Sequence, residues 1–129
     1  MVVSEITLNI KVSVECVFSS QHSMPLQNQF TFFYNITIEN LGDFSVRLLR
    51  RKWIIVDAHG SERQVEGEGV VGVQPSIPPQ DLHEYTSSCL LSTPFGVMRG
   101  SYTFERLLDG QLFSVIIPEF KLEVPYLLS

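Results

Sequence analysis

Gly67, Gly69 and Gly72 stand in the run Gly67-Glu68-Gly69-Val70-Val71-Gly72, which matches the G-x-G-x-x-G pattern of nucleotide-binding loops. In a dinucleotide-binding fold this loop closes a strand and opens a helix whose N-terminus faces the pyrophosphate. Here the glycines lead into a segment that contains Pro75, Pro78 and Pro79. Because proline lacks a backbone N–H and fixes φ, no helix is predicted to begin there. The pattern indicates β structure and a turn.

A glycine-rich turn can still bind phosphate, because successive backbone N–H groups can converge on an anion. Glu66 and Glu68 oppose that use, since they place negative charge beside the anion. The simpler interpretation is that Gly67, Gly69 and Gly72 allow a bulge or a close approach between sheets. Phosphate binding at these glycines is therefore kept as the alternative hypothesis.

The chain has one cluster of basic residues, formed by Arg47, Arg50, Arg51 and Lys52. Such a cluster can steer an anion, and Arg50 or Arg51 would then complete a ligand site with the glycine run. Clustered charge more often marks a solvated strand face or turn. The alternative function that joins both features is a sensor of a phosphorylated nucleotide or of pyrophosphate.

No metal site or cofactor is predicted. His22, His59 and His83 are far apart in the sequence, and no H-x-H or C-x-x-C spacing is present. A hard cation such as magnesium prefers several oxygen ligands. The glutamates near the glycine run could supply them, but an exposed acidic strand explains those residues more simply.

No catalytic residue is predicted either. Nucleophilic catalysis needs a Ser or Cys beside a base and an orienting acid. The nearest approach is Cys89 with His83 and Glu84. His83 and Cys89 fall on one face of a predicted strand, but six residues of extended chain separate them by roughly 20 Å, too far for proton transfer. We therefore predict that the protein is not an enzyme.

Length and composition favour one compact β domain. The chain has 129 residues, of which 44% are hydrophobic, 18% are charged and nine are Phe. That length suffices for one substantial core. The net charge of −5 offers no general polyanion surface, so no nucleic-acid partner is predicted.

The remaining bulk features favour a cytoplasmic protein. Residues 1–5 lack the basic segment that precedes the apolar part of a signal peptide. No apolar run approaches the roughly 20 residues of a membrane helix, so no membrane partner is predicted. Cys16 and Cys89 are widely spaced and are interpreted as free thiols of a reducing compartment.

Alternation of apolar and polar residues predicts a series of strands. The first is a single strand over Ile6–Phe18 with Cys16 facing the core, followed by a loop over Ser19–Asn28. The other strands are Gln29–Glu39, Phe44–Asp57, Glu62–Glu66, Leu82–Leu91, Val97–Leu107, Leu112–Ile117 and Phe120–Val124. A bulge is expected at Leu48–Arg51. Asp109-Gly110 predicts a two-residue hairpin loop, and Pro118 is expected to end a strand or mark an edge.

These strands and turns predict an all-β fold with no convincing helix. About seven to eight antiparallel strands at this spacing are typical of a fibronectin type III or immunoglobulin-like β-sandwich. The Cys…Trp…Cys pattern of antibody domains is absent.

The middle of the chain resembles the ApaG family. The matching stretches, in family order, are Leu49–Trp53, Val65–Pro75, Tyr85–Ser87, Thr93–Tyr102 and Phe113–Phe120. One departure is visible, because the family usually has a Pro-Gly turn where this chain has Pro78-Pro79-Gln80. Pro79 cannot take positive φ, so a type II turn with its glycine at that position is excluded and the loop is expected to differ locally.

The resemblance implies a single ApaG domain over residues 1–129, of the stand-alone bacterial form, with a fibronectin type III-like sandwich. Bacterial members of the family are associated with cobalt tolerance and magnesium efflux, and in eukaryotes the similar domain looks like a protein-interaction module. No catalytic residues carry over. The leading hypothesis is a non-enzymatic binding or regulatory module for an unidentified protein partner, and its edge strands leave a homodimer possible.

Overall fold

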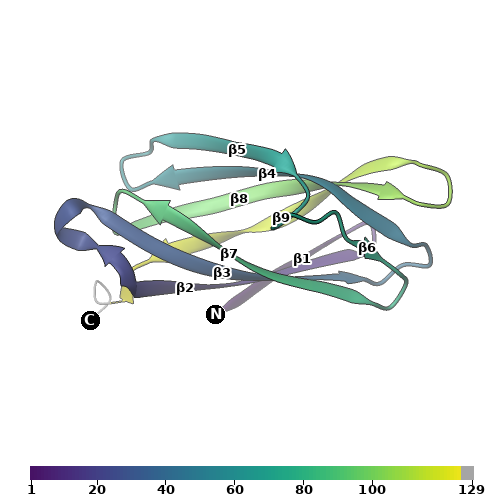
Figure 1. Cartoon of the computed structure of the whole chain (residues 1–129), viewed down its shortest axis with the longest axis horizontal. Helices are drawn as coiled ribbons and strands as arrows, with labels where there is room; N and C mark the ends of the chain where they lie inside the picture. Colours follow the sequence, from purple (N-terminus) through teal and green to yellow (C-terminus); the bar gives the residue numbers. More distant parts are fainter. Residues whose placement is uncertain (126–129) are drawn as a thin grey trace.

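Two antiparallel β-sheets pack face to face to form the fold (Figure 1). The structure is a computed structural model, and it describes residues 1–125. The first sheet has the order β1-β2-β3-β7, with bounds Val2–Thr7, Ile10–Met24, Gln29–Asn40 and Leu82–Leu91. The second has the order β5-β4-β8-β9, with bounds Glu62–Glu68, Val46–Asp57, Phe95–Arg106 and Leu112–Glu123. A short strand, β6 (Ser76–Ile77), also pairs with β4.

This architecture confirms the predicted all-β sandwich. The strands that the sequence did not predict are β1 and β6, and the only helix within residues 1–125 is a 3₁₀ turn, η1 (Pro25–Gln27). Alternate residues of β2, β3, β4, β7, β8 and β9 point between the sheets and form one core. Strand β3 shows this most clearly, because its inward residues are at most 5% exposed: Phe30, Phe32, Tyr34, Ile36 and Ile38.

Strand β4 carries the predicted bulge, and the bulge changes which residues face the core. Its register with β8 shifts between Leu48 and Arg50. Before the shift Leu48 is buried, and after it Trp53 and Ile55 are buried. Inward positions therefore pass from even to odd residue numbers. The shift places Arg51 on the inner face of the sheet.

The prediction of one strand over Ile6–Phe18 was wrong. The chain turns back at Leu8 and Asn9, which have φ of 48° and 67°, and β1 pairs with β2 as a hairpin. Both central residues have positive φ, as a two-residue hairpin loop requires. Asn tolerates that conformation, but Leu8 is not a turn residue and it falls on an apolar step of the alternation. The period of two therefore continued across the turn.

The loop predicted over Ser19–Asn28 is largely strand. Strand β2 continues to Met24, and its pairing with β3 is irregular between Ser19 and Met24. Side chains hold this extension, since the Ser23 hydroxyl donates to the Ser19 carbonyl oxygen at 2.6 Å and accepts from the Thr31 N–H at 2.9 Å. Polar composition alone could not distinguish this irregular strand from a loop.

One turn prediction was wrong, and two predictions about prolines can be compared with the structure. Asp109-Gly110 belongs to a longer loop, because the Arg106 N–H donates to the Gln111 carbonyl and only Gly110 of that pair has positive φ. Of the two roles expected for Pro118, the second is confirmed: β9 runs through Pro118 with a register shift opposite Met98–Gly100, and β9 is an edge strand.

The loop before β7 confirms that Pro79 does not take positive φ. Gln80 has a φ of 66°, and the Asp81 N–H donates to the Pro78 carbonyl oxygen at 3.1 Å. These are the features of a type II turn with Pro79 at its second position and Gln80 at its third. The turn forms with the positive φ on Gln80 and not on Pro79, as the fixed φ of proline requires.

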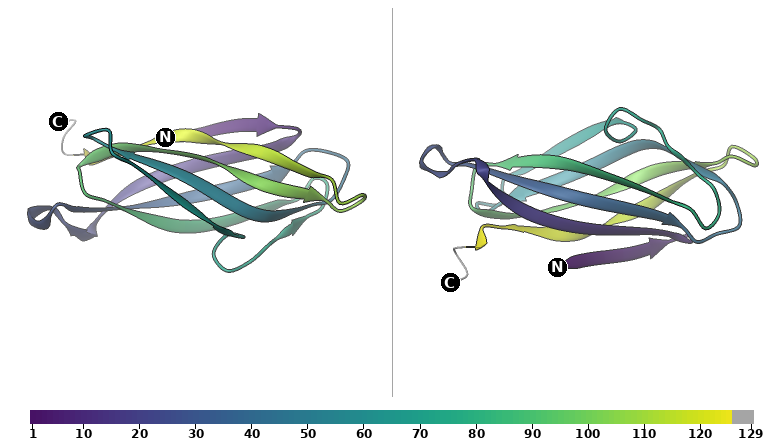
Figure 2. Two further views of the ribbon diagram at one scale, coloured as in Figure 1. Left: turned by 90° about the horizontal axis from the view of Figure 1, so that it is seen from above. Right: turned by 60° about the horizontal axis from the view of Figure 1, so that its bottom comes forward.

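The two sheets meet along one flank and separate along the other. On the first flank β1 runs beside β9, and the Ile116 N–H donates to the Thr7 hydroxyl at 3.1 Å (Figure 2). On the opposite flank the edge strands are β5 and β7. There the side chain of Arg63 reaches from one sheet to the other. We call this second side the β5–β7 flank.

Candidate binding site on the β5–β7 flank

The register of the strands determines which side chains line the β5–β7 flank. Residues directly opposite each other in a ladder project from the same face. Arg63 lies opposite Ile55 and Val65 lies opposite Trp53, and both of those β4 partners are buried. The inner face of β5 therefore presents Arg63 and Val65. From the other sheet β7 contributes Tyr85, Ser87 and Cys89, which lie opposite inward residues of β3.

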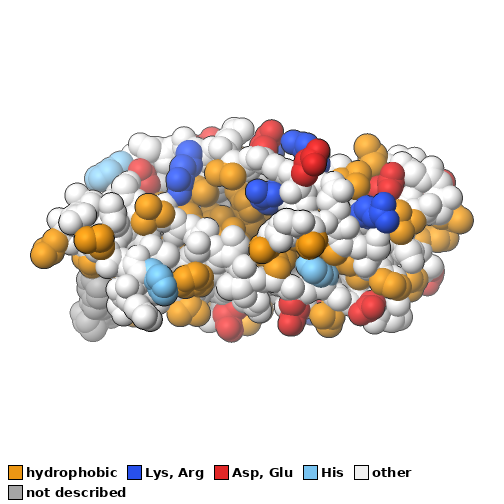
Figure 3. Space-filling model, viewed as in Figure 1, with side chains coloured by type: hydrophobic (Ala, Val, Ile, Leu, Met, Phe, Trp, Pro, Cys, Tyr) orange, Lys and Arg blue, Asp and Glu red, His pale blue; other side chains and the backbone are white. Residues whose placement is uncertain are grey.

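Charge is segregated between the two faces of β5. Glu62, Glu66 and Glu68 alternate with the inward residues and project from the outer face. There the Lys52 ammonium lies 4.0 Å from the Glu66 carboxylate, and the Arg99 guanidinium lies 3.3 Å from that of Glu62. Arg51 of β4 and Arg63 of β5 lie on the inner face, and the inward positions of β5 and β7 hold no carboxylate. Asp57 and Glu62 line the hollow beside Arg63 from the β4–β5 hairpin end, where Glu62 pairs with Arg99. Hydrophobic and basic side chains lie together along this band in the space-filling view (Figure 3).

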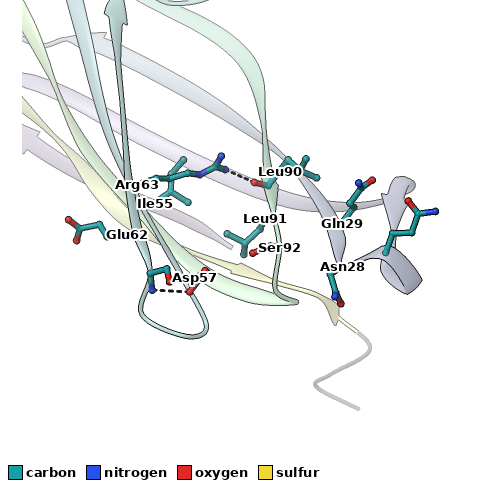
Figure 4. A pocket seen from close by; sticks show the side chains of 11 residues that line it. Asn28, Gln29, Ile55, Asp57, Glu62, Arg63, Leu90, Leu91 and Ser92 are labelled. Carbon is teal, nitrogen blue, oxygen red and sulfur yellow. Dashed lines mark hydrogen bonds between the residues drawn. The ribbon is translucent and has the colours of Figure 1, made fainter.

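Arg63 spans the flank at its end near the β4–β5 hairpin. Its Nη2 donates to the Leu90 carbonyl oxygen and lies 3.6 Å from the Cys89 Sγ. Figure 4 shows Arg63 reaching from β5 across a hollow towards Leu90 of β7. The hollow has a volume of about 400 Å³, and Ile55 and Leu91 form part of its lining. The Arg63 guanidinium thus occupies a main-chain hydrogen-bond acceptor on the edge strand β7.

Arg51 and the glycine run come together, as the sequence hypothesis required, but mainly through the carbonyls of the run. The Arg51 Nη1 donates to the carbonyl oxygens of Glu68 and Gly69, each at 2.9 Å. A Cβ on Gly67 would lie 2.8 Å from the Arg51 guanidinium, so this side chain lies flat across Gly67. The glycine at position 67 makes room for an arginine.

Backbone pairing within the glycine run uses several of the N–H groups that a phosphate would need. The Gly69 N–H donates to the Leu49 carbonyl oxygen at 2.8 Å. Val70 and Val73 exchange N–H···O bonds of 2.8 and 3.1 Å around a turn whose central residues, Val71 and Gly72, both have positive φ. This is the predicted turn, and it has the φ signs of type I′.

Arg50 is separated from this arrangement. It lies opposite Glu68 on the outer face of the second sheet and is exposed. Of the residues proposed for a phosphate site, Arg51, Gly67 and Gly69 lie together, Gly72 is at the exposed tip of the turn, and Arg50 faces away. Bulge geometry in β4 produces this separation, and the sequence pattern indicated a bulge but not its consequence for the two arginines.

Three tyrosines lie close behind Arg51. Burial raises the pKa of Tyr34, Tyr85 and Tyr102, and in each case the positive charge of Arg51 opposes that rise. The Tyr85 and Tyr102 hydroxyls hydrogen-bond to each other and so join β7 to β8. The floor of the flank is therefore aromatic, with its hydroxyl groups paired below the guanidinium.

The thiols of the chain are protonated at neutral pH. Burial raises the pKa of Cys16 to about 12. Burial also raises the pKa of Cys89, although the neighbouring Arg63 opposes the shift. Both cysteines are free and neither carries the thiolate that a nucleophile needs. Cys16 packs against the core as expected, although it is only partly buried.

His83 and Cys89 both occupy inward positions of β7, as predicted, six residues apart. The Nε2 of His83 is buried and has no hydrogen-bond partner within the described residues. Within residues 1–125 no group of three His, Cys, Asp or Glu side chains is placed to hold a metal ion.

Strand β7 is an edge strand that lacks the usual protection against pairing with another chain, and the sequence alone did not show that it lies at an edge. Natural proteins protect edge strands with charge, proline, bulges or short length. Strand β5 carries charge, β9 carries Pro118 and a bulge, and β1 is short and lies against β9. Strand β7 has ten residues, no proline or glycine, and Glu84 as its one acidic or basic residue besides His83. It is the least protected edge of the two sheets.

Known proteins match this chain over most of its length. The family model of the ApaG domain matches residues 20–106. Protein ApaG of Shewanella denitrificans is 46% identical over 117 residues, which cover 91% of this chain and 92% of that protein. Protein ApaG of Edwardsiella ictaluri is 41% identical over 122 residues, covering 93% and 95%.

A solved structure agrees with the fold. The crystal structure of a putative ApaA protein from Bordetella pertussis has 40% sequence identity and a TM-score of 0.87, and the match covers 90% of this chain and 94% of that one. In the described part of the chain, no helix has the length and apolar character needed to cross a membrane.

Proposed function

The chain belongs to the ApaG family, and we propose that it is a non-enzymatic binding and regulatory module that mediates protein–protein interaction. The observation that carries the proposal is the β5–β7 flank, where a long unprotected edge strand lies beside a lining of aromatic and basic side chains. Edge strands bind partner chains through their main-chain groups, and the neighbouring side chains confer selectivity.

The chemistry of the thiols supports the non-enzymatic part of the proposal. The raised pKa values of Cys16 and Cys89 keep both thiols protonated at neutral pH. His83 lies too far along β7 to act on Cys89. The link of the family to cobalt tolerance and magnesium efflux would then act through a protein partner in the cytoplasm, with no cofactor on this chain and no nucleic acid or membrane as partner.

The second candidate is the sensor of a phosphorylated nucleotide or pyrophosphate. Its support is the position of Arg51 against the glycine turn, since the guanidinium donates through Nη1 to Glu68 and Gly69 and keeps further N–H groups. Against it, the N–H groups of Gly69, Val70 and Val73 already pair within the protein. A phosphate would have to displace these bonds.

One experiment separates the two candidates and a metal-binding role. Thermal stability of the pure protein is measured with magnesium, cobalt, pyrophosphate and a diadenosine polyphosphate. A ligand at about 100 times its dissociation constant adds roughly 2.7 kcal/mol of stability. We expect no saturable rise with any of them. A rise with a phosphate compound that Arg51→Gln abolishes would replace the interaction module by the sensor.

The interaction itself is tested by capture from a cell lysate. We expect the wild-type protein to retain a partner in fixed stoichiometry. Arg99→Gln changes the outer face of the second sheet, away from the β5–β7 flank, and should retain the same partner as the wild type. If no protein is retained in fixed stoichiometry by either form, the interaction module is wrong.

A further inference from the structure

We propose that the β5–β7 flank binds an acidic segment of a partner protein as an added strand along the free edge of β7, with its carboxylates directed to Arg51 and Arg63. This inference rests on the proposed function and specifies its partner chemistry. Three features of the flank support it: the direction of the free main-chain groups, the charge of the lining and the spacing of the two arginines.

Main-chain groups of β7 point into the flank at alternate residues. In an antiparallel ladder, residues that exchange hydrogen bonds with the neighbouring strand alternate with residues whose N–H and C=O point away from it. The Leu90 carbonyl accepts from Arg63 of the other sheet, so it points away from β3. Ser88 and Thr86 share its parity, and their N–H and C=O groups therefore face the flank as well. An extended segment can pair with them.

Arg63 holds the place of such a segment at one end. Its guanidinium donates to the Leu90 carbonyl, which is the acceptor that the N–H of an added strand would use. Arg63 is exposed, so its side chain can turn away without opening the core. Its charge would then be released close to the incoming chain, where a carboxylate can receive it.

The charge of the lining selects an acidic segment. The protein has a net charge of −5, yet the inner face of the flank carries Arg51 of β4 and Arg63 of β5, and the inward positions of β5 and β7 hold no carboxylate. Asp57 and Glu62 line the hollow at the β4–β5 hairpin end, and Glu62 already pairs with Arg99 on the outer face. Glu84 projects from the outer face of β7, where it accepts from the Thr37 hydroxyl at 3.3 Å. A second copy of this chain on the flank would bring the same two arginines against each other. Charge complementarity therefore favours an acidic partner over a homodimer.

The spacing of the lining residues predicts the pattern of the segment. Arg51 lies opposite Gly67, and Arg63 is four residues away from Gly67 along β5, with Val65 between them. Four residues of extended chain span about 13 Å, and residues i, i+2 and i+4 point to one side. Val65 is 39% exposed and offers an apolar contact at the centre. The pattern is thus acidic, any residue, apolar, any residue, acidic.

A small anion does not account for these features. It would reach one arginine at a time, because about 13 Å separates the two positions along the strand. It would also leave the free N–H and C=O groups of Thr86 and Ser88 without main-chain partners. An extended acidic peptide uses both arginines and the edge of β7.

The test uses fluorescein-labelled peptides and the full chain. The probe is Ser-Asp-Thr-Val-Thr-Asp-Ser, and its controls replace both Asp by Lys or both Thr by Pro. Binding is followed by fluorescence anisotropy at low and at physiological salt. We expect the acidic peptide to bind, the Lys peptide not to bind, and the Pro peptide to bind at least about tenfold more weakly because it cannot donate to the edge.

Two pairs of protein variants identify the site. Ser88→Pro removes an N–H that faces the flank, and its matched control is Ser114→Pro, an exposed serine on the edge strand β9 whose N–H shares the outward parity of Ile116. Arg63→Gln removes a charge from the inner face, and Arg99→Gln removes one from the outer face. We expect Ser88→Pro and Arg63→Gln each to weaken binding at least about tenfold, and the two controls to change it by less than about twofold.

Several results would overturn the inference. Absence of binding up to about 1 mM peptide, a free energy of only about −4.1 kcal/mol, would do so. Equal binding by Ser88→Pro and Ser114→Pro would show that strand addition is wrong. A dimer in light scattering that Ser88→Pro dissociates would assign the edge to a second copy. If a lysate partner is still captured by Ser88→Pro, the inference fails while the interaction module stands.

Discussion

The buried side chain of Asn40 hydrogen-bonds to three main-chain groups at one end of the sandwich. It is 1% exposed, and its Nδ2 donates to the carbonyl oxygens of Phe44 and Ile77 at 2.8 and 2.9 Å. Its Oδ1 accepts from the Gly42 N–H at 3.0 Å. Asn40 is the last residue of β3, and its contact with Ile77 comes from a segment far along the chain. No local pattern could have indicated that partner.

Asn40→Asp is expected to destabilise the protein by about 3 kcal/mol at neutral pH, because a buried carboxylate would face two carbonyl oxygens that need a donor. Urea denaturation followed by tryptophan fluorescence measures the change. The loss should become smaller at acid pH, where the protonated carboxyl can donate one hydrogen bond. A variant as stable as the wild type would contradict the role assigned to the Asn40 amide.

The buried thiol of Cys16 predicts a loss of stability in alkali. The folded protein keeps this proton up to a pKa of about 12, whereas the unfolded thiol loses it near 9.0. Between those values the unfolded state holds fewer protons, so the free energy of unfolding falls as pH rises. Urea titrations at pH 8 and pH 10.5 measure the fall. Cys16→Ala should reduce its slope, and an unchanged slope would exclude Cys16 as a cause.

At the scale of elements, regular alternation predicted β3 and β7 closely but did not reveal the turn between β1 and β2. The predicted strand Leu82–Leu91 has the observed bounds of β7, and Gln29–Glu39 differs from β3 by one residue. Both strands have long regular alternation, which tertiary contacts reinforce. The hairpin at Leu8–Asn9 was missed because apolar residues continue through it. The irregular extension of β2 was missed because its bonds involve serine side chains.

The turn between Val70 and Val73 contains a strained residue. Val71 has a φ of 45°, which is unusual for a β-branched residue, and its side chain is 62% exposed. Val71→Asn would create the Asn-Gly pair that type I′ turns favour. We expect the variant to be about 1 kcal/mol more stable, as measured by urea denaturation. A loss of stability would mean that the contacts of the Val71 side chain stabilise the protein by more than its positive φ destabilises it.

Gly69 and Gly72 distinguish the steric cost of adding a Cβ from the cost of a positive φ. Gly69 and Gly72 have φ of 62° and 80°, but a Cβ on Gly69 would lie 2.2 Å from the Val73 carbonyl oxygen, whereas one on Gly72 would meet nothing within 4 Å. We expect Gly72→Ala to cost about 1 kcal/mol and Gly69→Ala at least about twice that. Thermal unfolding of both variants gives the comparison. Equal costs would mean that the backbone near Val73 shifts freely.

At the scale of the whole molecule, the sequence predicted the sandwich but not its open side. The glycine run and the basic cluster were both identified from the sequence. Whether they form one binding site depends on their relative position in the fold. The bulge in β4 turns Arg51 inward and leaves Arg50 outside. Which edge strands face each other depends on the order β5-β4-β8-β9 and β1-β2-β3-β7. Long-range pairing sets that order, and periodicity within one strand carries no information about it.

The free edge of β7 predicts how the isolated protein aggregates. Unprotected edges pair with other chains, and a lysine on an edge strand opposes such pairing. Ser88→Lys should therefore slow aggregation at high concentration and moderate heating, as followed by light scattering. Ser13→Lys, on the interior strand β2, is the control and should have little effect. If both variants aggregate at the wild-type rate, another surface nucleates the process.

The hollow between β1 and the end of β9 has a consequence for how the domain can be joined to other proteins. Met1 and Pro125, the first and last described residues, line the same hollow and so lie at one corner of the domain. That corner belongs to the flank where β1 runs beside β9, opposite the β5–β7 flank. Neighbouring ends of this kind tolerate insertion into a host chain and circular permutation. A fusion partner joined at Met1 is expected to leave the edge of β7 in solvent, because Met1 lies near the β1–β9 flank.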